Sequence, residues 1–125
     1  MNSRLAMSLA ALLFAIGVII GALGSHALTN VLAPQQLASL GTAVDYQLFN
    51  ALGLLVVGLL MHTLPAARLR LIAWALLLGI IFFSGGIYVM LAGAPKFLGY
   101  ITPLGGVMLI LAWLALTIVL WRSGR

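Results

Sequence analysis

Long uncharged hydrophobic runs alternate with short polar segments along the whole chain. The hydrophobic runs predict four helices, at about residues 5–27, 43–62, 69–92 and 101–122. Each run is close to the roughly 20 residues that a helix needs to cross about 30 Å of hydrocarbon. No stretch alternates between apolar and polar positions as a barrel strand does. The pattern therefore predicts an all-α, integral membrane four-helix bundle, with residues 1–125 forming a single membrane domain.

The second hydrophobic run is the weakest of the four, because its first turns carry a carboxylate and two amides. It crosses the membrane fully only if these polar groups face other helices or the membrane interface. Ahead of it, Pro34 is followed by good helix formers, a pattern that starts a helix with proline at its first position. We therefore expect a short helix at about residues 34–41, either lying in the interface or extending the second span, with Gly41 as the candidate position for a break.

Composition strengthens the membrane prediction and removes several classes of function. Of the 125 residues, 65% are hydrophobic and 6% are charged, and there is no cysteine. The apolar content far exceeds that of a soluble domain, and the lack of cysteine excludes disulfides, thiolate metal sites and thiol catalysis. The net charge of +5 invites a nucleic-acid interpretation, but the six basic residues lie at segment ends and form no stripe. We expect them to orient the chain and contact anionic lipids, and we expect no nucleic-acid partner.

The basic residues also predict which way the chain crosses the membrane. If it crosses four times, Lys96 falls on one side, and on the other side fall Arg4, Arg68, Arg70, Arg122 and Arg125. Lysine and arginine accumulate in cytoplasmic loops, so both termini are predicted to be cytoplasmic. The small-x-small sequence at residues 25–27 resembles a signal-peptide cleavage site, but the preceding apolar run is longer than the roughly 7–15 residues of a signal peptide. We therefore expect a retained first span.

With this orientation, all four helices carry their polar and small residues toward the outer leaflet, whereas their inner halves are almost entirely apolar. The predicted polar cluster consists of Ser25, His26, Asp45, Tyr46, Gln47, Asn50, Ser84, Tyr88 and Thr102. Small residues let helix backbones approach closely in lipid. The candidates for this packing role are Gly17, Gly21, Gly53, Gly85, Gly86, Gly105 and Gly106.

Asp45, the only acidic residue of the chain, and His26 can titrate within this polar cluster. The structural interpretation is that the cluster holds the helices together, since polar side chains in membrane bundles hydrogen-bond across helices for about 0.6 kcal/mol each. The functional interpretation is a small-molecule, ion or proton site that opens outward, with His26 and Asp45 as its titratable pair. Intramembrane polar groups need partners whatever the function, so we favour the structural interpretation.

Catalytic and metal chemistry finds little support in the sequence. Ser25, His26 and Asp45 contain the residue types of a hydrolytic triad, but no nucleophile motif frames the serine, and adjacent helical residues point about 100° apart. His62 is predicted at the inner end of the second helix, far from His26, which excludes a bis-histidine haem within one chain. A metal site built from His26 and Asp45 lacks a third ligand. We expect no enzyme activity, no cofactor, and no catalytic, cofactor-binding or metal-binding residue.

Four short motifs occur in order, and they carry a family resemblance. They are Gly21-Ala-Leu-Gly-Ser-His-Ala-Leu28, Asp45-Tyr-Gln-Leu-Phe-Asn50, Phe83-Ser-Gly-Gly-Ile-Tyr88 and Thr102-Pro-Leu-Gly-Gly106, the last followed by Trp113. From about residue 17 to residue 121 the chain resembles the YgdD-like small inner-membrane proteins, a family catalogued as a domain of unknown function. The resemblance implies a multi-pass, four-helix protein of the bacterial inner (plasma) membrane, and it supplies no catalytic residues.

The resemblance also exposes one departure. The family pattern usually has histidine at the position of Asn50, in a Tyr-Gln-x-x-His arrangement. Asparagine keeps the hydrogen bonding without titration, which favours the structural interpretation of the cluster.

Two hypotheses for the function follow. The first is a non-enzymatic membrane protein whose polar cluster organises the bundle and binds a partner, a lipid or a small ligand. Its expected partners are membrane lipids and either further copies of the chain or another membrane protein. The alternative is an oligomeric transporter or channel for a small molecule, ion or proton that uses His26 and Asp45. The apolar inner halves of the helices argue against a polar path through one protomer.

Overall fold

The computed structural model describes residues 1–123, most of which lie in four long α-helices. The elements in chain order are α1 (Ser3–Ser25), α2 (Pro34–Leu60), α3 (Ala66–Leu91), the 3₁₀ helix η1 (Lys96–Tyr100) and α4 (Ile101–Ser123). All four long segments have the length and apolar character needed to cross a membrane, and residues 1–123 contain no strand. The predicted all-α fold with four membrane-crossing helices is confirmed. The predicted topology signal Arg125 lies outside the described residues.

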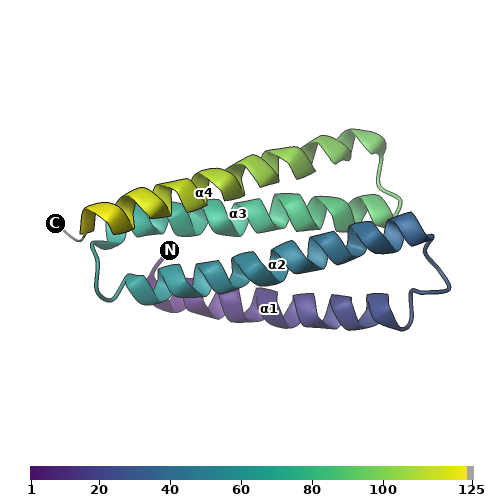
Figure 1. Cartoon of the computed structure of the whole chain (residues 1–125), viewed down its shortest axis with the longest axis horizontal. Coiled ribbons are helices and arrows are strands. Elements are labelled where there is room, and N and C mark those ends of the chain that lie inside the picture. Colours follow the sequence, from purple (N-terminus) through teal and green to yellow (C-terminus); the bar gives the residue numbers. More distant parts are fainter. Residues whose placement is uncertain (124–125) are drawn as a thin grey trace.

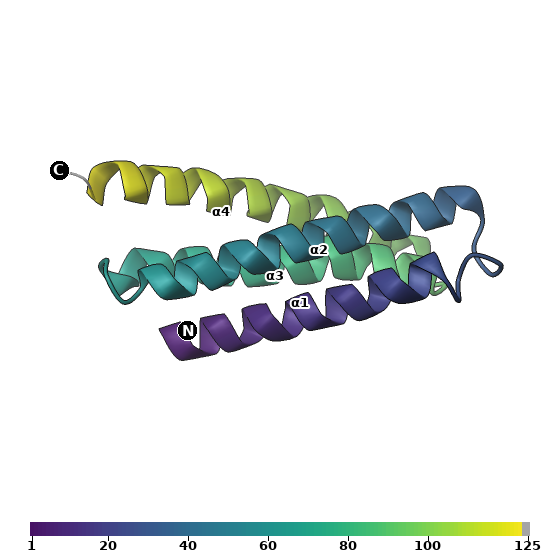
Figure 2. The same ribbon diagram turned by 60° about the horizontal axis from the view of Figure 1, so that its bottom comes forward.

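Each helix runs antiparallel to its sequence neighbour, and both termini lie at the same end of the bundle (Figure 1). α2 and α3 lie between α1 and α4, which occupy opposite sides (Figure 2). Burial follows this order. In α2 and α3, 50% and 44% of the most apolar stretch is buried, against 17% in α1 and 22% in α4. Short connections favour such an order, because they place each helix beside the one before it.

Helix α2 is longer than the predicted second span. Pro34 occupies its first turn, and the Gln36 side chain accepts a hydrogen bond from the Ala33 N–H at 2.8 Å, so the helix start is well capped. The helix continues through Gly41, and the expected break there was wrong. One glycine costs a helix only about 1 kcal/mol, which the continuous hydrogen bonding outweighs. Segment 34–41 therefore extends the second span rather than lying in the interface.

The remaining helix ends lie within a few residues of the predicted ones, and local signals explain them. At the start of α1, the Asn2 side chain accepts a hydrogen bond from the Leu5 N–H at 2.8 Å, as an N-cap does. After α3, Gly93 adopts a φ of 96°. This left-handed conformation ends helices and favours glycine.

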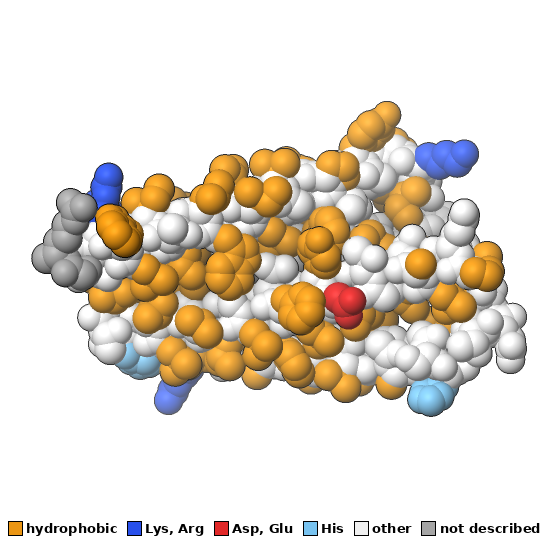
Figure 3. All heavy atoms as spheres, in the orientation of Figure 1, with side chains coloured by type: hydrophobic (Ala, Val, Ile, Leu, Met, Phe, Trp, Pro, Cys, Tyr) orange, Lys and Arg blue, Asp and Glu red, His pale blue; other side chains and the backbone are white. Residues whose placement is uncertain are grey.

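Apolar side chains fill the end of the bundle that holds the termini. The cluster combines two alanines of α1 with mostly larger side chains of the other helices: Ala6, Ala10, Leu54, Val57, Leu69, Ile72, Ala73, Leu76, Leu77, Ile80, Leu109, Ala112 and Leu116. Hydrophobic side chains also cover the outer surface (Figure 3). Because lipid tails are as apolar as leucine, burial of these side chains in a membrane gains little free energy, and the bundle depends on close packing and hydrogen bonds.

Glycines allow α3 and α4 to approach each other closely. A Cβ added to Gly105 would collide with the backbone of Phe83, and one added to Gly79 would lie 2.7 Å from the Leu109 side chain. On the same interface, Gly86 leaves room for the Thr102 hydroxyl. Gly85 differs from these, because a Cβ there would meet no atom within 4 Å. Its predicted packing role within the chain is therefore wrong, because no neighbouring helix approaches it closely.

Gly105→Ala is expected to destabilise the bundle by about 1–3 kcal/mol, the usual cost of overpacking, because the obstacle is backbone that cannot rotate aside. Gly85→Ala adds the same methyl group to open space and serves as the matched control. Thermal unfolding of both variants in detergent measures the difference. Equal melting temperatures would show that α3 and α4 do not depend on this close approach.

Candidate functional site

Gln47 lies at the centre of the buried polar residues and links three helices. Its side chain is 2% exposed. The amide Nε2 donates to the Leu13 carbonyl of α1 at 2.7 Å, and Oε1 accepts from the Tyr88 hydroxyl of α3 at 2.6 Å. Both ends of the amide are thus used, and a single residue of α2 joins α1 and α3.

Two further side chains extend these links. Ser84 of α3, 1% exposed, donates to the Ala43 carbonyl of α2 at 2.7 Å. Asn50 accepts from the Trp113 indole N–H of α4 at 2.8 Å and donates to the Tyr46 carbonyl of its own helix at 2.8 Å. We call the interhelical bonds of Gln47, Asn50 and Ser84 the polar ties. Through them α2 is bonded to each of the other three helices.

Glycines lie beside the polar ties on α1 and α2. A Cβ on Gly17 would lie 2.8 Å from Leu48, and one on Gly21 would lie 3.2 Å from Val44. Gly53 faces the ring of Trp113, where an added Cβ would be 2.5 Å away. A Cβ added to Gly106 would make only ordinary van der Waals contact with the Phe83 ring, at 3.5 Å. These small residues let the hydrogen-bonding groups come within reach.

The polar ties lie deeper in the bundle than the predicted outer layer. Leu13, whose carbonyl accepts from Gln47, is near the middle of α1. Trp113, whose indole N–H donates to Asn50, is near the middle of α4. The prediction placed these residues too far out because it started the second span at about residue 43. Since α2 begins at Pro34, its polar turn lies near mid-helix.

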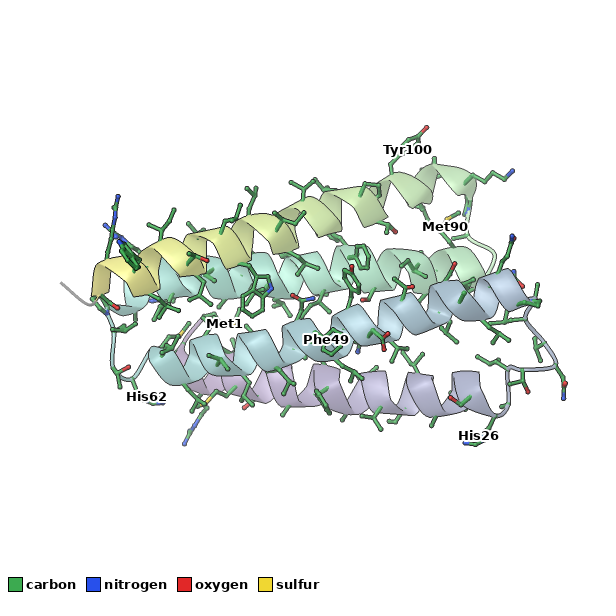
Figure 4. All side chains as sticks on the ribbon, viewed as in Figure 1. Met1, His26, Phe49, His62, Met90 and Tyr100 are labelled. Carbon is green, nitrogen blue, oxygen red and sulfur yellow. The ribbon has the colours of Figure 1, made fainter. Side chains whose placement is uncertain are left out.

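The titratable residues of the predicted cluster are not brought together as a pair. His26 lies at the exposed end of α1 (Figure 4), and within residues 1–123 it forms no ion pair with Asp45. Val44 packs against Gly21, so Asp45 lies about one helical turn, roughly 6 Å, deeper than the end of α1. The expected equal depth of His26 and Asp45 was wrong, because α2 begins at Pro34 and not at about residue 43.

The remaining cluster members occupy the edges of the site. Ser25 and Asp45 line a small hollow of about 250 Å³ between α1 and α2. Thr102 packs on Gly86 at the start of α4. Tyr46 is exposed on α2 and stacks on Phe83 of α3, with ring centroids 4.7 Å apart and planes inclined by 20°.

A larger groove opens between α2 and α4 beside the polar ties. Its volume is about 680 Å³, within the range of roughly 300–1,000 Å³ typical of small-molecule sites. Aromatic side chains from three helices line it, together with smaller apolar groups and two polar residues: Tyr46, Phe49, Phe83, Trp113, Gly106, Leu109, Ile110, Leu114, Asn50 and Thr117.

One further interhelical hydrogen bond, outside the polar ties, was not predicted from the sequence. The Ser3 hydroxyl donates to the Gly58 carbonyl at 2.8 Å and lies 2.8 Å from His62 Nε2, so it joins the start of α1 to the end of α2. His62 and His26 lie at opposite ends of the bundle (Figure 4). A serine and a histidine at helix ends carry no pattern that distinguishes them from ordinary boundary residues, so no sequence signal was available.

The hydrogen bonds determine what this arrangement can do chemically. Within residues 1–123 every buried side-chain nitrogen and oxygen has a partner, and no three potential metal ligands come together. The buried polar groups are therefore committed to helix–helix bonds. Asp45 differs, because none of the side-chain hydrogen bonds formed within residues 1–123 involves its carboxylate, which is exposed among apolar side chains (Figure 3).

Fold and site together define a small multi-pass membrane protein whose polar side chains bond helix to helix. The chain belongs to the family described as protein of unknown function (DUF423), whose model matches residues 20–106. The expected membership in a membrane-protein family of unknown function is thereby confirmed. No solved structure matches the chain.

Relatives in several bacteria carry the name UPF0382 membrane protein. The one from Staphylococcus saprophyticus is 39% identical over 98 residues, which cover 78% of this chain and 81% of that protein. YwdK from Bacillus subtilis is 36% identical over 107 residues, 85% of each chain. A relative from Haemophilus influenzae is 32% identical over the same share of each chain.

The Asn50–Trp113 hydrogen bond is expected to couple α2 to α4 by about 0.6 kcal/mol, and by no more than about 1.7 kcal/mol. A double-mutant cycle with Asn50→Ala and Trp113→Phe isolates this energy, because phenylalanine removes the donor and keeps a ring. Unfolding free energies in mixed micelles provide the measurement.

Trp121→Phe is the control for this cycle, since Trp121 is exposed at the end of α4. It should show no coupling with Asn50→Ala. Additive effects of Asn50→Ala and Trp113→Phe would rule out a contribution of this bond to stability.

Proposed function

We propose that this is a non-enzymatic membrane protein of the bacterial inner membrane. In this proposal the polar ties hold the four helices in a fixed arrangement, and the groove between α2 and α4 takes a partner from the membrane phase. Such a partner is a lipid, a small ligand or another membrane protein.

The observation that carries the proposal is the bonding of Gln47. An amide buried in a membrane helix is costly unless both its donor and its acceptor are satisfied. Here they are satisfied by a backbone carbonyl and a tyrosine hydroxyl of two other helices. Atoms committed in this way are poorly suited to proton transfer or nucleophilic attack, which supports a structural role.

The groove supports the binding half of the proposal. Its walls are held in place by the Asn50–Trp113 bond and by the stacking of Tyr46 on Phe83. A preformed concavity loses little conformational entropy when a ligand binds. The polar ties therefore serve the groove as well as the bundle.

The distribution of basic residues supports the inner membrane and cytoplasmic termini. Arg4, Arg68, Arg70 and Arg122 belong to the end of the bundle where both termini lie, and Lys96 belongs to the opposite end. Positive residues remain on the cytoplasmic side during insertion into the bacterial inner membrane.

Gln47→Met is expected to lower the unfolding free energy by about 1 kcal/mol, because it removes two interhelical bonds of about 0.6 kcal/mol each and leaves Tyr88 without its partner. Gln35→Met makes the same change at an exposed position near the start of α2 and should have little effect. Thermal unfolding in detergent compares the two. A Gln47→Met variant as stable as Gln35→Met would remove the main support for the structural role.

A reporter fused after Arg125 is expected to give a cytoplasmic signal, because four of the five basic residues within residues 1–123 lie at the end of the bundle that holds the termini. The same reporter inserted after Gly93, in the connection between α3 and α4, should give a periplasmic signal. Alkaline phosphatase and green fluorescent protein fusions read the two locations. Reversed signals would overturn the predicted orientation.

A further inference from the structure

We propose that the groove between α2 and α4, together with Asp45, binds a lipophilic organic cation. This names a ligand class for the groove and so rests on the binding half of the proposed function. It does not depend on the stability contributed by Gln47, which is measured separately by unfolding. Asp45 lies on α2 between this groove and the small hollow toward α1, next to the groove residues Tyr46 and Phe49.

The first observation is the position of the chain's single carboxylate. Asp45 lies well inside α2 and is exposed on the side of the helix that also presents Phe49 and Leu52. Within residues 1–123 it has no cationic partner, since the described basic residues belong to the two ends of the bundle. An ionised carboxylate that faces hydrocarbon costs free energy. A cationic partner from outside the chain would therefore stabilise it.

The second observation is the aromatic lining of the adjoining groove. Tyr46 directly follows Asp45, and Phe49 lies one helical turn further on, so the carboxylate and the groove wall belong to the same stretch of α2. Phe49, labelled on α2 in Figure 4, is exposed. Trp113 and Phe83 complete the aromatic surface from α4 and α3.

The two observations indicate one ligand chemistry. Aromatic faces attract cations, most strongly where water is excluded, and aromatic surfaces recognise quaternary ammonium groups in this way. The carboxylate supplies the opposite charge, and the apolar groove accepts the hydrocarbon part of the ligand. A neutral lipid chain would use the groove but leave Asp45 unpaired. A second copy of the chain would bring another carboxylate to the same surface, and like charges repel.

The rigidity of the groove adds to this match. Trp113 is held by its hydrogen bond to Asn50 and is seated against Gly53, and Tyr46 is held by stacking on Phe83. Fixed aromatic walls suit rigid ligands that carry aromatic rings, because neither partner loses much conformational entropy on binding.

The test uses tetraphenylphosphonium as the probe and the full-length protein in nanodiscs. Equilibrium dialysis measures binding above that of empty nanodiscs, which accounts for partition into lipid. Tetraphenylborate has the same shape and the opposite charge. We expect saturable binding of tetraphenylphosphonium at about one site per chain and no saturable binding of tetraphenylborate.

Variants locate the site. Asp45→Asn should weaken tetraphenylphosphonium binding by about tenfold or more through loss of the charge, whereas Asp45→Glu should retain affinity within about threefold. Phe49→Leu should weaken binding by about threefold or more through loss of an aromatic wall. Phe97→Leu is its matched control, because Phe97 is exposed to the same degree, 68% against 67%, and lies outside the groove.

Three results would each overturn the proposal. Binding no greater than that of empty nanodiscs means that the protein has no site for a lipophilic cation. Equal affinity of wild type and Asp45→Asn, with unchanged circular dichroism, means that the carboxylate plays no part. Equal losses in Phe49→Leu and Phe97→Leu mean that the groove is not the site. Because the Gln47 variants are scored by unfolding, failure of this proposal and failure of the polar ties are distinguishable.

Discussion

The bundle depends on the need of every polar group inside a membrane to find a partner within the protein. Helix α2 carries most of these groups, and its side chains or carbonyls are bonded to all three other helices. The Gln47 side chain forms hydrogen bonds with α1 and α3. The Ala43 carbonyl accepts a hydrogen bond from Ser84 of α3, and the Asn50 side chain accepts one from Trp113 of α4. In lipid the hydrophobic effect contributes little to association between helices. A few satisfied hydrogen bonds therefore have a large influence on helix order and register.

Close packing and hydrogen bonding stabilise different parts of the bundle. The end that holds the termini is packed with apolar side chains, and α3 supplies the largest share of that cluster. The polar ties act from the middle of the helices toward the opposite end. Between α3 and α4, where glycines bring the backbones together, no tie is needed. Between α2 and α4 the helices stand apart, Trp113 bridges them, and the groove results.

Asp45 differs from Gln47 and Asn50 of α2 in its exposure and in its hydrogen bonding. Gln47 and Asn50 are buried and bonded within the chain, whereas Asp45 is exposed and unbonded among the described residues. An interaction that serves only the bundle does not explain a carboxylate on this surface. It directly precedes Tyr46, which lines the aromatic groove, and this position suits the proposed role in ligand binding.

The sequence by itself determined the four membrane-crossing helices, because uncharged apolar runs of this length have few other stable forms. It also singled out Gln47, Asn50, Ser84 and Tyr88, since polar residues are rare in such runs. Only the tertiary structure decided their partners, because Leu13 and Ala43 contribute backbone carbonyls that no side-chain pattern marks. Only the tertiary structure showed the position of the polar ties along the bundle, since the continuous helix from Pro34 places Gln47 near the middle of α2. The groove depends on how far α4 stands from α2, a distance fixed by packing across three helices.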